Sequence, residues 1–528
     1  MDTQYCFWIS ATLFSLFASY FCVNNFVWRL NEWYYNLKQR NKEYPLPPGD
    51  LGWPFIGNML TFVKHFSSGH PDSFINNIVS KYGRTGIYKS HLFGSPSAII
   101  CDADLIMSVL TDDETYKFSY PKSTVEVLKY KRYWNFSRKE HMLFRRIISS
   151  LTMNNNSLEN YLSSIEDIMI EFLEDFSSMN HPIELLKEMK NISFKVIVGI
   201  FMGSSDQQFI TKIGNSFTHM HSALFCMPIN LPGFAFRRGL IAREKLAKLV
   251  KPIVKERRLM IRNGDKKNLL DILLQVNDED GWKPDDDDII QMLIAMVLAG
   301  HETTAHGMMW SIIYLTQNPH IMKKAKEEQE EIMKARHGTN KRLCFEEIKK
   351  MVYLSQIIDE MLRHISLTFA LFRETTRDVN INGYLIPKGW KVLPWLKAMH
   401  KDPTYYSNPD EFNPSRWNDH NTKNGTFIPF GVGSRFCPGN NLAKIEIYVF
   451  LHYFILNYKL ERVNPDCPIT CLPAPMPIDN CLAKVIKVIE SEGCIPSVVR
   501  VGVIALICNT RGDERLLLLI VDYSVVEL

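Results

Sequence analysis

The stretch Phe430-Gly431-Val432-Gly433-Ser434-Arg435-Phe436-Cys437-Pro438-Gly439 sets one cysteine in a glycine-rich loop that runs into the apolar segment 441–456. That segment is long and apolar enough to predict a helix, so Cys437 would lie at a helix N-terminus. Free N–H groups and the helix dipole favour a thiolate there, the form of cysteine that binds metal. The glycines would let the backbone approach a flat ligand, and Arg435 could meet a carboxylate. Taken alone, such a cysteine is more often a buried structural thiol.

A long helix is predicted upstream, over residues 285–317. Pro284 and the aspartates after it favour its start, and Asn318-Pro319 ends it. Its middle reads Ala299-Gly300-His301-Glu302-Thr303-Thr304, although helix interiors disfavour Gly and Thr, so a purely structural helix would not need this sequence. His301 and His306 resemble a zinc-protease motif, but their i,i+5 spacing separates the side chains by about 140°, which excludes a shared zinc ion.

A third motif is Glu360-Met361-Leu362-Arg363. Positions i and i+3 share one helix face, so the acid and the base can bond within their own helix. Further along the chain, Phe412-Asn413-Pro414-Ser415-Arg416-Trp417 supplies a second arginine. Taken alone, the first pair is a common helix salt bridge.

These motifs, in this order, resemble the haem-thiolate monooxygenases, the cytochrome P-450 superfamily, whose cysteine loop reads F-x-x-G-x-R-x-C-x-G. The resemblance extends from the N-terminal apolar segment to about Val488. It implies a mainly α fold with small β-sheets (α+β), the cytochrome P-450 fold, with an N-terminal transmembrane helix. It also implies haem b (iron protoporphyrin) as cofactor, with Cys437 as the axial ligand of the haem iron and with Phe430, Gly431, Arg435 and Gly439 in the cofactor-binding loop.

The resemblance assigns roles to the other motifs as well. A buried network of Glu360, Arg363 and Arg416 would brace the cysteine loop, and removing one partner would leave an uncompensated buried charge. In the long helix, two small residues would open a groove for dioxygen, and an acid and an alcohol would relay protons to the distal oxygen; these residues are Ala299, Gly300, Glu302 and Thr303. The haem propionates would contact His141, Arg145 and Arg373, with His141 at a position where Trp is commoner in the family.

The composition is that of an ordinary globular protein. The chain has 528 residues, of which 46% are hydrophobic and 22% charged, so it allows one large domain or several smaller ones and excludes disorder or a coiled coil. Because the motifs from His141 to Cys437 would surround one haem, a single large domain is favoured. A net charge of +4 disfavours bulk nucleic-acid binding. The 11 cysteines form an odd, sparse set, which favours a reducing compartment.

Residues 1–28 are expected to form a transmembrane anchor, because residues 3–28 carry no charge and a helix needs about 20 apolar residues to cross a bilayer. Basic residues follow the apolar run, which favours an uncleaved anchor over a secretory signal and leaves the rest of the chain on the cytosolic side. Residues 29–58 would form a basic, Pro/Gly-rich linker, residues 59–488 the haem-thiolate monooxygenase catalytic domain, and residues 489–528 an atypical C-terminal tail of unknown role. We therefore expect a single-pass protein of the endoplasmic reticulum membrane with a cytosolic catalytic domain.

The resemblance implies an oxidoreductase, a monooxygenase that hydroxylates or oxidises a lipophilic terpenoid with O₂. The sequence has no flavin or nicotinamide motif, so electrons from NADPH would arrive through a separate NADPH–cytochrome reductase. Residues 46–54, 382–390 and 479–484 resemble the plant terpenoid-oxidising branch, both β-amyrin 11-oxidases and ent-kaurenoic acid oxidases. Residues 67–78 and 316–332 are nearer to the β-amyrin oxidases.

The expected reaction is the oxidation of a β-amyrin-type triterpene at C-11, and the apolar segment 227–239 could enter the lipid surface from which such a substrate comes. The alternative is the oxidation of ent-kaurenoic acid in gibberellin biosynthesis, for which Lys129, Lys131 or Arg132 could meet the substrate carboxylate. An alternative of another class is a non-catalytic haem-binding membrane protein, because the tail 489–528 resembles nothing in the family.

Overall fold

The computed structural model describes residues 29–37, 42–129, 138–203, 206–260, 268–276, 283–336, 342–418 and 423–488, together with residues 8, 12, 13, 15, 19, 26 and 27. The chain divides into two units, Met1–Val488 and Ile489–Leu528, and the second lies outside the described residues. Most of the expected anchor, residues 1–28, also lies outside them. Among the positions that are described, no helix combines the length and apolar character needed to cross a bilayer.

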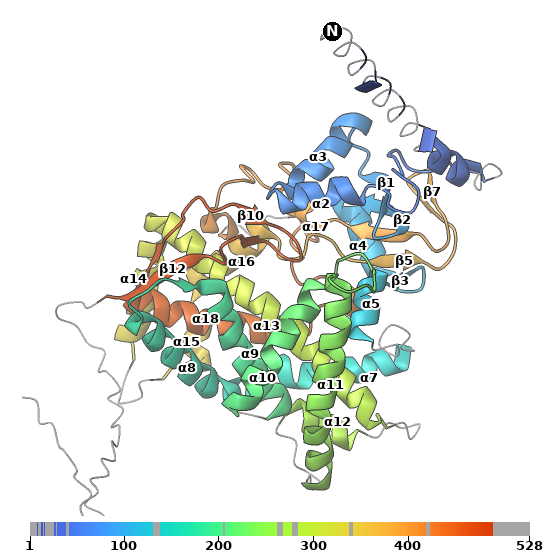
Figure 1. Ribbon diagram of the computed structural model, residues 1–528. Helices are drawn as coiled ribbons and strands as arrows, with labels where there is room; N and C mark the ends of the chain where they lie inside the picture. The colour runs from blue at the N-terminus through green and yellow to red at the C-terminus, as the bar shows by residue number, and fades with distance from the viewer. Residues whose placement is uncertain are drawn as a thin grey trace, which may run out of the picture. The chain divides into compact units, whose positions relative to one another are not determined.

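The first unit is mainly helical, and most of its helices lie to one side of its largest sheet (Figure 1). The α-helices are α2 (Met59–Ser67), α3 (Pro71–Tyr82), α4 (Ala103–Thr111), α5 (Lys122–Leu128), α7 (Arg138–Thr152), α8 (Asn155–Ser178), α9 (Leu185–Met202), α10 (Gln207–Ser222), α11 (Ala235–Met260), α12 (Leu269–Gln275), α13 (Asp286–Gln317), α14 (Pro319–Lys334), α15 (Phe345–Lys350), α16 (Val352–Ile365), α17 (Leu396–His400) and α18 (Asn440–Asn457). Two short 3₁₀ helices are η1 (Pro414–Trp417) and η2 (Gly433–Arg435).

Small sheets complete this α+β architecture. The largest has the strand order β1-β2-β8-β5-β3, in which β2 and β8 are parallel and the other pairs antiparallel. The strands are β1 (Ile87–Leu92), β2 (Ser95–Ile100), β3 (Tyr116–Phe118), β4 (Ile183–Glu184), β5 (Arg373–Thr375), β6 (Val379–Ile381), β7 (Tyr384–Ile386), β8 (Lys391–Pro394), β9 (Tyr458–Arg462), β10 (Ile469–Thr470), β11 (Met476–Pro477) and β12 (Leu482–Lys487).

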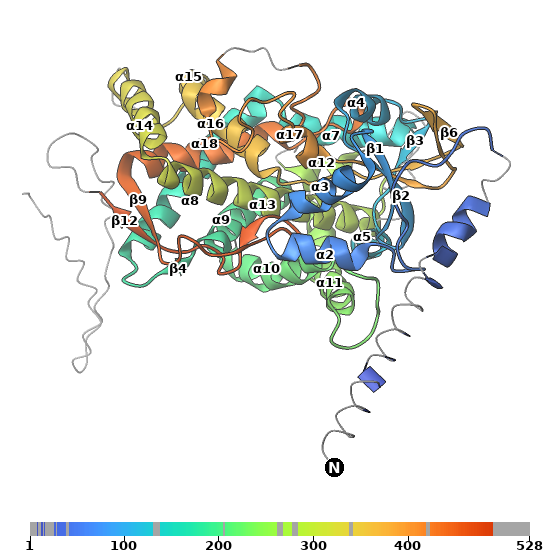
Figure 2. The same cartoon turned by 90° about the horizontal axis from the view of Figure 1, so that it is seen from above.

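Helix α13 runs through the middle of the helical part and confirms the helix predicted over residues 285–317. The Asp285 side chain caps it by accepting a hydrogen bond from the Asp288 N–H (2.7 Å), and Pro319 begins the next helix. Most side chains of residues 289–315 are buried, because α9, α11, α16 and α18 pack around this helix (Figure 2). A helix that is apolar all round belongs in a core, and α13 lies there.

The segment before the first described helix of the body is bound to that body. Asn31 is buried, and its Nδ2 donates to the carbonyls of Leu51 and Gly52 at 3.0 and 3.1 Å. Glu32 accepts a hydrogen bond from the Leu51 N–H (2.8 Å) and forms a 2.9 Å ion pair with Lys89 of β1. Residues 29–58, expected as a linker, therefore carry specific contacts to the sheet.

Candidate active site

The loop of Cys437 has the closed backbone that its glycines predict. The Cys437 N–H donates to the Phe430 carbonyl at 2.9 Å, which joins the two ends of the loop. Gly431 and Gly433 adopt left-handed φ angles of 73° and 72°, which favour glycine. A Cβ at Gly433 would also lie 3.1 Å from the Leu110 carbonyl oxygen, so α4 approaches the loop too closely for a side chain there.

Helix α7 holds the loop from its other side. Arg145 Nη1 donates to the Phe436 carbonyl, and Thr152 Oγ1 donates to the Pro438 carbonyl at 2.6 Å. The two residues on either side of Cys437 are thus fixed by one helix. The sequence indicated Arg145 but not Thr152, because a threonine at a helix end carries no signal for a partner so far along the chain.

The thiol of Cys437 differs from the expectation in its acidity. Desolvation raises its pKa, and the backbone N–H groups of Gly439 and Asn440, with Arg145, only partly offset that effect. The expectation that the helix N-terminus lowers this pKa is therefore wrong for the protein alone, since burial outweighs the dipole. A coordinated metal cation deprotonates a thiol outright, so binding of a metal would convert the Cys437 thiol to a thiolate.

A group of cations lies next to the loop. The guanidinium of Arg373 in β5 and that of Arg435 in η2 lie 5.4 and 5.3 Å from the ring centre of Phe118. Arg373 is only 2% exposed, burial lowers its pKa, and among the described residues no carboxylate forms an ion pair with it. Burial, with Arg435 and Arg145, lowers the pKa of His141 to about 4, so this ring is neutral at pH 7.

Such an arrangement is costly without an anion, since a buried guanidinium needs a compensating charge. The residues present therefore fit a ligand that brings acidic groups to Arg373, Arg435 and His141 and a metal to Cys437. A haem with its two propionates has this chemistry.

Between residues 289 and 315 of α13, the exposed side chains are those of Ala299 and Thr303, while most of the surrounding helix is buried. Thr303 Oγ1 donates to the Ala299 carbonyl at 2.9 Å. Gly300 instead faces α9, because a Cβ on it would lie 3.1 Å from Ile197 Cδ1. This glycine permits close helix packing, and the open side of α13 belongs to Ala299 and Thr303.

Glu302 points to a different side of α13 from Thr303, because neighbouring helical residues project about 100° apart. It is buried and lies 2.9 Å from Lys190 of α9 and 3.2 Å from His221 of α10. Glu302 and Thr303 therefore project from α13 in different directions, and the expected proton relay between them stays a prediction. Nor do His301 and His306 form part of a metal-binding group among the described residues.

The Glu360 network is present in detail. Glu360 is fully buried; its Oε1 accepts from Arg363 Nη2 and Arg416 Nε at 2.9 Å each, and its Oε2 accepts from Arg363 Nε at 2.9 Å. Trp417 Nε1 donates to Oε2 at 3.2 Å, a fourth member that the sequence did not indicate. Desolvation alone would raise the pKa of Glu360, but the two arginines hold it below its usual range.

This network reaches the cysteine loop through His400. Arg363 Nη1 donates to the His400 carbonyl (2.9 Å), and His400 Nε2 accepts from the Ile428 N–H (3.4 Å), two residues before Phe430. Tyr406 adds a hydrogen bond from its hydroxyl to the Thr426 carbonyl (3.1 Å). The segment that leads into the cysteine loop is therefore connected to α16 by these hydrogen bonds.

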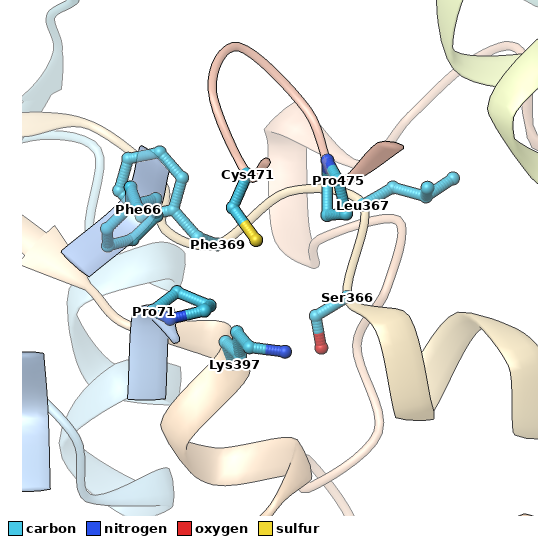
Figure 3. A pocket seen from close by; sticks show the side chains of 8 residues that line it. All are labelled: Phe66, Pro71, Ser366, Leu367, Phe369, Lys397, Cys471 and Pro475. Carbon is cyan, nitrogen blue, oxygen red and sulfur yellow. The ribbon is translucent and has the colours of Figure 1, made fainter. Parts of the chain in front are cut away.

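A small cavity lies beyond the end of α16. Figure 3 shows Lys397 and Cys471 directed into it and Ser366 at its edge. Its lining consists of Phe66, Pro71, Ser366, Leu367, Phe369, Lys397, Cys471 and Pro475.

Comparisons with known proteins agree with this site. Residues 47–481 match the family model for cytochrome P450, so the chain belongs to that family. It is 58% identical over 486 residues to beta-amyrin 11-oxidase from Glycyrrhiza uralensis, covering 91% of this chain and 99% of the relative. It is 44% identical over 462 residues to ent-kaurenoic acid oxidase 2 from Arabidopsis thaliana, covering 87% and 94%. A solved structure, retinoic acid bound cyanobacterial CYP120A1, matches with a TM-score of 0.76 at 26% identity, covering 84% and 100%.

The protein is therefore a cytochrome P450 monooxygenase with the P450 fold, mostly helical with small sheets. The family carries haem b and receives NADPH-derived electrons through a reductase partner. Because the chain belongs to this family of monooxygenases, the alternative of a non-catalytic haem-binding membrane protein is disfavoured.

Proposed function

We propose that this enzyme oxidises a β-amyrin-type triterpene at C-11, in the endoplasmic reticulum membrane, with electrons from NADPH–cytochrome reductase. The observation that carries the proposal is the 58% identity to beta-amyrin 11-oxidase over almost the whole of that relative. The site supports it chemically, since the chain combines a cysteine loop and a cation group beside it with two exposed side chains in the middle of the otherwise buried helix α13.

The bound haem would supply the oxidising chemistry for an unactivated C–H bond. Cys437 would hold its iron, and Arg373, Arg435, His141 and Arg145 would hold its propionates through charge-assisted hydrogen bonds. Phe430, Gly431 and Gly439 would shape the loop against the ring. Thr303, on the open side of α13 beside Ala299, would hold a proton near the reacting oxygen, and Glu302 would pass protons to it.

Exposed apolar side chains support membrane association. In the segment between α10 and α11, Met227, Leu231 and Phe234 are 47%, 57% and 45% exposed, and before α2 Phe55 is 89% exposed. Large exposed apolar groups on a body that carries a basic juxtamembrane segment favour contact with lipid. We assign the expected anchor, residues 1–28, to the same membrane.

The second candidate substrate is ent-kaurenoic acid, because the relatives named ent-kaurenoic acid oxidase are 41–44% identical. Such a substrate would need a cation in the pocket. Of the three candidates in the loop after α5, Lys129 is exposed, and Lys131 and Arg132 lie outside the described residues.

The test is turnover in microsomes that contain the full chain and a plant NADPH–cytochrome reductase. β-Amyrin and ent-kaurenoic acid are supplied separately with NADPH, and products are identified by mass spectrometry. We expect an NADPH-dependent product of β-amyrin oxygenated at C-11 and none with the Cys437→Ala variant. Oxidation of ent-kaurenoic acid alone would instead establish the second candidate.

A further inference from the structure

A buried group of titratable side chains surrounds Glu302 on the side of α13 that faces α9 and α10. Glu302 is 2% exposed, and its Oε2 lies 2.9 Å from Lys190 Nζ and 3.2 Å from His221 Nδ1. Its Oε1 lies 3.6 Å from His301 Nε2. A carboxylate buried this deeply needs cations or hydrogen-bond donors beside it, and here most of these groups come from α9 and α10.

The histidines of this group have defined roles. His301 Nδ1 and His306 Nδ1 donate to backbone carbonyls one turn earlier, at 2.6 and 2.7 Å, so it is His301 Nε2 that faces Glu302. The ring of His306 lies 6.4 Å from that of His221. Burial lowers the pKa of His221 to about 3 and that of His306 to about 4, so both rings are neutral at pH 7.

Lys190 is therefore the cation that balances Glu302. Desolvation alone would raise the pKa of this carboxyl, but His221, His301 and Lys190 hold it well below its usual range. Glu302 is thus a carboxylate at pH 7. It can accept a proton and pass it on, but it does not store one.

The group also connects the interior to solvent. The side chains of Lys190 and His221 are 22% and 16% exposed, whereas that of Glu302 is 2% exposed. Lys190 thus reaches the surface at one end and touches the carboxylate at the other. Phe194 of α9 and Phe217 of α10 pack edge-on against His301, with ring centres 5.0 and 5.6 Å away.

We propose that Lys190 and His221 are positioning residues for monooxygenation, which hold Glu302 in place and supply it with protons that enter between α9 and α10. This rests on the proposed role of Glu302 as a proton donor to the reaction. The proposal accounts for a carboxylate that lies in a lysine and histidine cluster.

The stoichiometry of monooxygenation determines how many protons must reach the site. Monooxygenation takes two electrons from NADPH and two from the substrate C–H bond; one oxygen atom forms the alcohol, and the other leaves as water with two protons from solvent. In each transfer, Glu302 accepts a proton that enters from solvent past Lys190 and His221, while the Lys190 ammonium keeps its charge and holds the carboxylate in place. Glu302 then releases that proton on the side of Thr303 and returns to its carboxylate form.

The test compares Lys190→Met with Lys190→Arg in the reductase-containing microsomes, using β-amyrin and NADPH. We expect Lys190→Met to lower product formation at least about tenfold, to divert NADPH electrons into hydrogen peroxide and to increase the solvent deuterium isotope effect. Lys190→Arg should restore most of the coupling, since it keeps the cation. The matched control is Lys187→Met on the same helix, where the lysine is 67% exposed and pairs with Glu184 at 3.8 Å.

Glu302→Gln separates failure of this proposal from failure of the role given to Glu302. If Glu302→Gln keeps wild-type coupling, that role is wrong. If Glu302→Gln loses coupling while Lys190→Met and His221→Gln keep coupling and isotope effect unchanged, only the present proposal is overturned. The reduced carbonyl spectrum verifies that each variant holds haem.

A double variant covers the case in which Lys190→Met does not fold because it leaves Glu302 unpaired. Lys190→Met with Glu302→Gln removes both charges, so folding is no longer opposed by a lone buried carboxylate. The proposal requires this double variant to match Glu302→Gln in coupling and isotope effect. A further loss in the double variant would show that Lys190 acts independently of Glu302 and would overturn the proposal.

Discussion

At the scale of single residues, Cys437 and the cations beside it define the chemistry. The sequence indicated the cysteine, the loop glycines and Arg435 correctly as neighbours, because they are contiguous. It could not give the acidity of the thiol, which depends on how deeply the fold buries it.

We predict that Cys437→Ser abolishes the red-shifted Soret band of the reduced carbonyl complex, because the serine oxygen is a harder and more weakly donating ligand than a thiolate. The variant should still fold, since the hydroxyl keeps the size of the side chain. Absorption spectra of reduced, carbonyl-treated protein provide the measurement. An unchanged band in Cys437→Ser would remove the thiolate assignment.

Arg363→Lys is predicted to be severe although it conserves charge. The guanidinium pairs with both oxygens of Glu360 and also donates to the carbonyls of His400 and Pro409, and an ammonium cannot reproduce this fork. We expect a loss of about 3–5 kcal/mol in the free energy of unfolding and a lower haem content.

The control for that experiment is Arg342→Lys. Arg342 also pairs with an acid, Asp167, but both side chains are more than half exposed, at 52% and 59%. Exposed pairs contribute about 0–1 kcal/mol, so urea unfolding should barely shift. Equal effects of the two substitutions would contradict the importance given to burial.

At the scale of elements, hydrophobic pattern predicted the helices well and their partners poorly. The helix over residues 285–317 formed as expected because its cap and its stop are local. The sequence could not predict which neighbour each residue of this helix faces. Gly300 faces α9, and Glu302 contacts residues of α9 and α10 that lie far away in the sequence. Lys190 could not be recognised, since a lone lysine in a helix is usually a surface residue.

Helices α9 and α18 are joined by a second buried acid, which gives a pH prediction. Glu446 is fully buried and accepts a hydrogen bond from Ser193 Oγ at 2.8 Å, and burial raises its pKa to about 8. In the unfolded chain it ionises near its ordinary value, so its contribution to stability is complete below that value and is lost as pH rises through about 8. Glu446→Gln should therefore gain stability relative to wild type between pH 5 and 8.

Urea unfolding at pH 5, 6.5 and 8, followed by tryptophan fluorescence, measures this difference. The slope should approach about 1.4 kcal/mol per pH unit in the wild type relative to the variant. Glu461→Gln is the control, because Glu461 is 54% exposed in its pair with Lys459. Parallel pH curves for wild type and Glu446→Gln would show that Glu446 is ionised in the folded state.

At the scale of the whole molecule, the sequence predicted one large haem-binding domain, and the contacts place residues up to Val488 in one compact unit. Its last described contact is the hydrogen bond from the Val488 N–H to the Asn457 carbonyl at 2.8 Å. The family model ends at residue 481, before the second unit begins.

We therefore predict that a chain ending at Val488 binds haem and turns over as the full chain does. Each of the contacts described above for Cys437, Glu360 and Glu302 is complete without residues 489–528. The measurements are the reduced carbonyl spectrum and the rate of product formation per haem. Loss of haem in the shortened chain would assign a structural role to those residues.

The position of α9 has a practical consequence for protein engineering. One turn of this helix carries Lys190 against Glu302 of α13, and the next carries Ser193 against Glu446 of α18, the helix that follows Cys437. A mutant library that diversifies α9 to change product selectivity would disturb the distal and proximal sides of the active site together. Screens for new oxidation products should keep positions 190 and 193 constant and place their diversity on other helices.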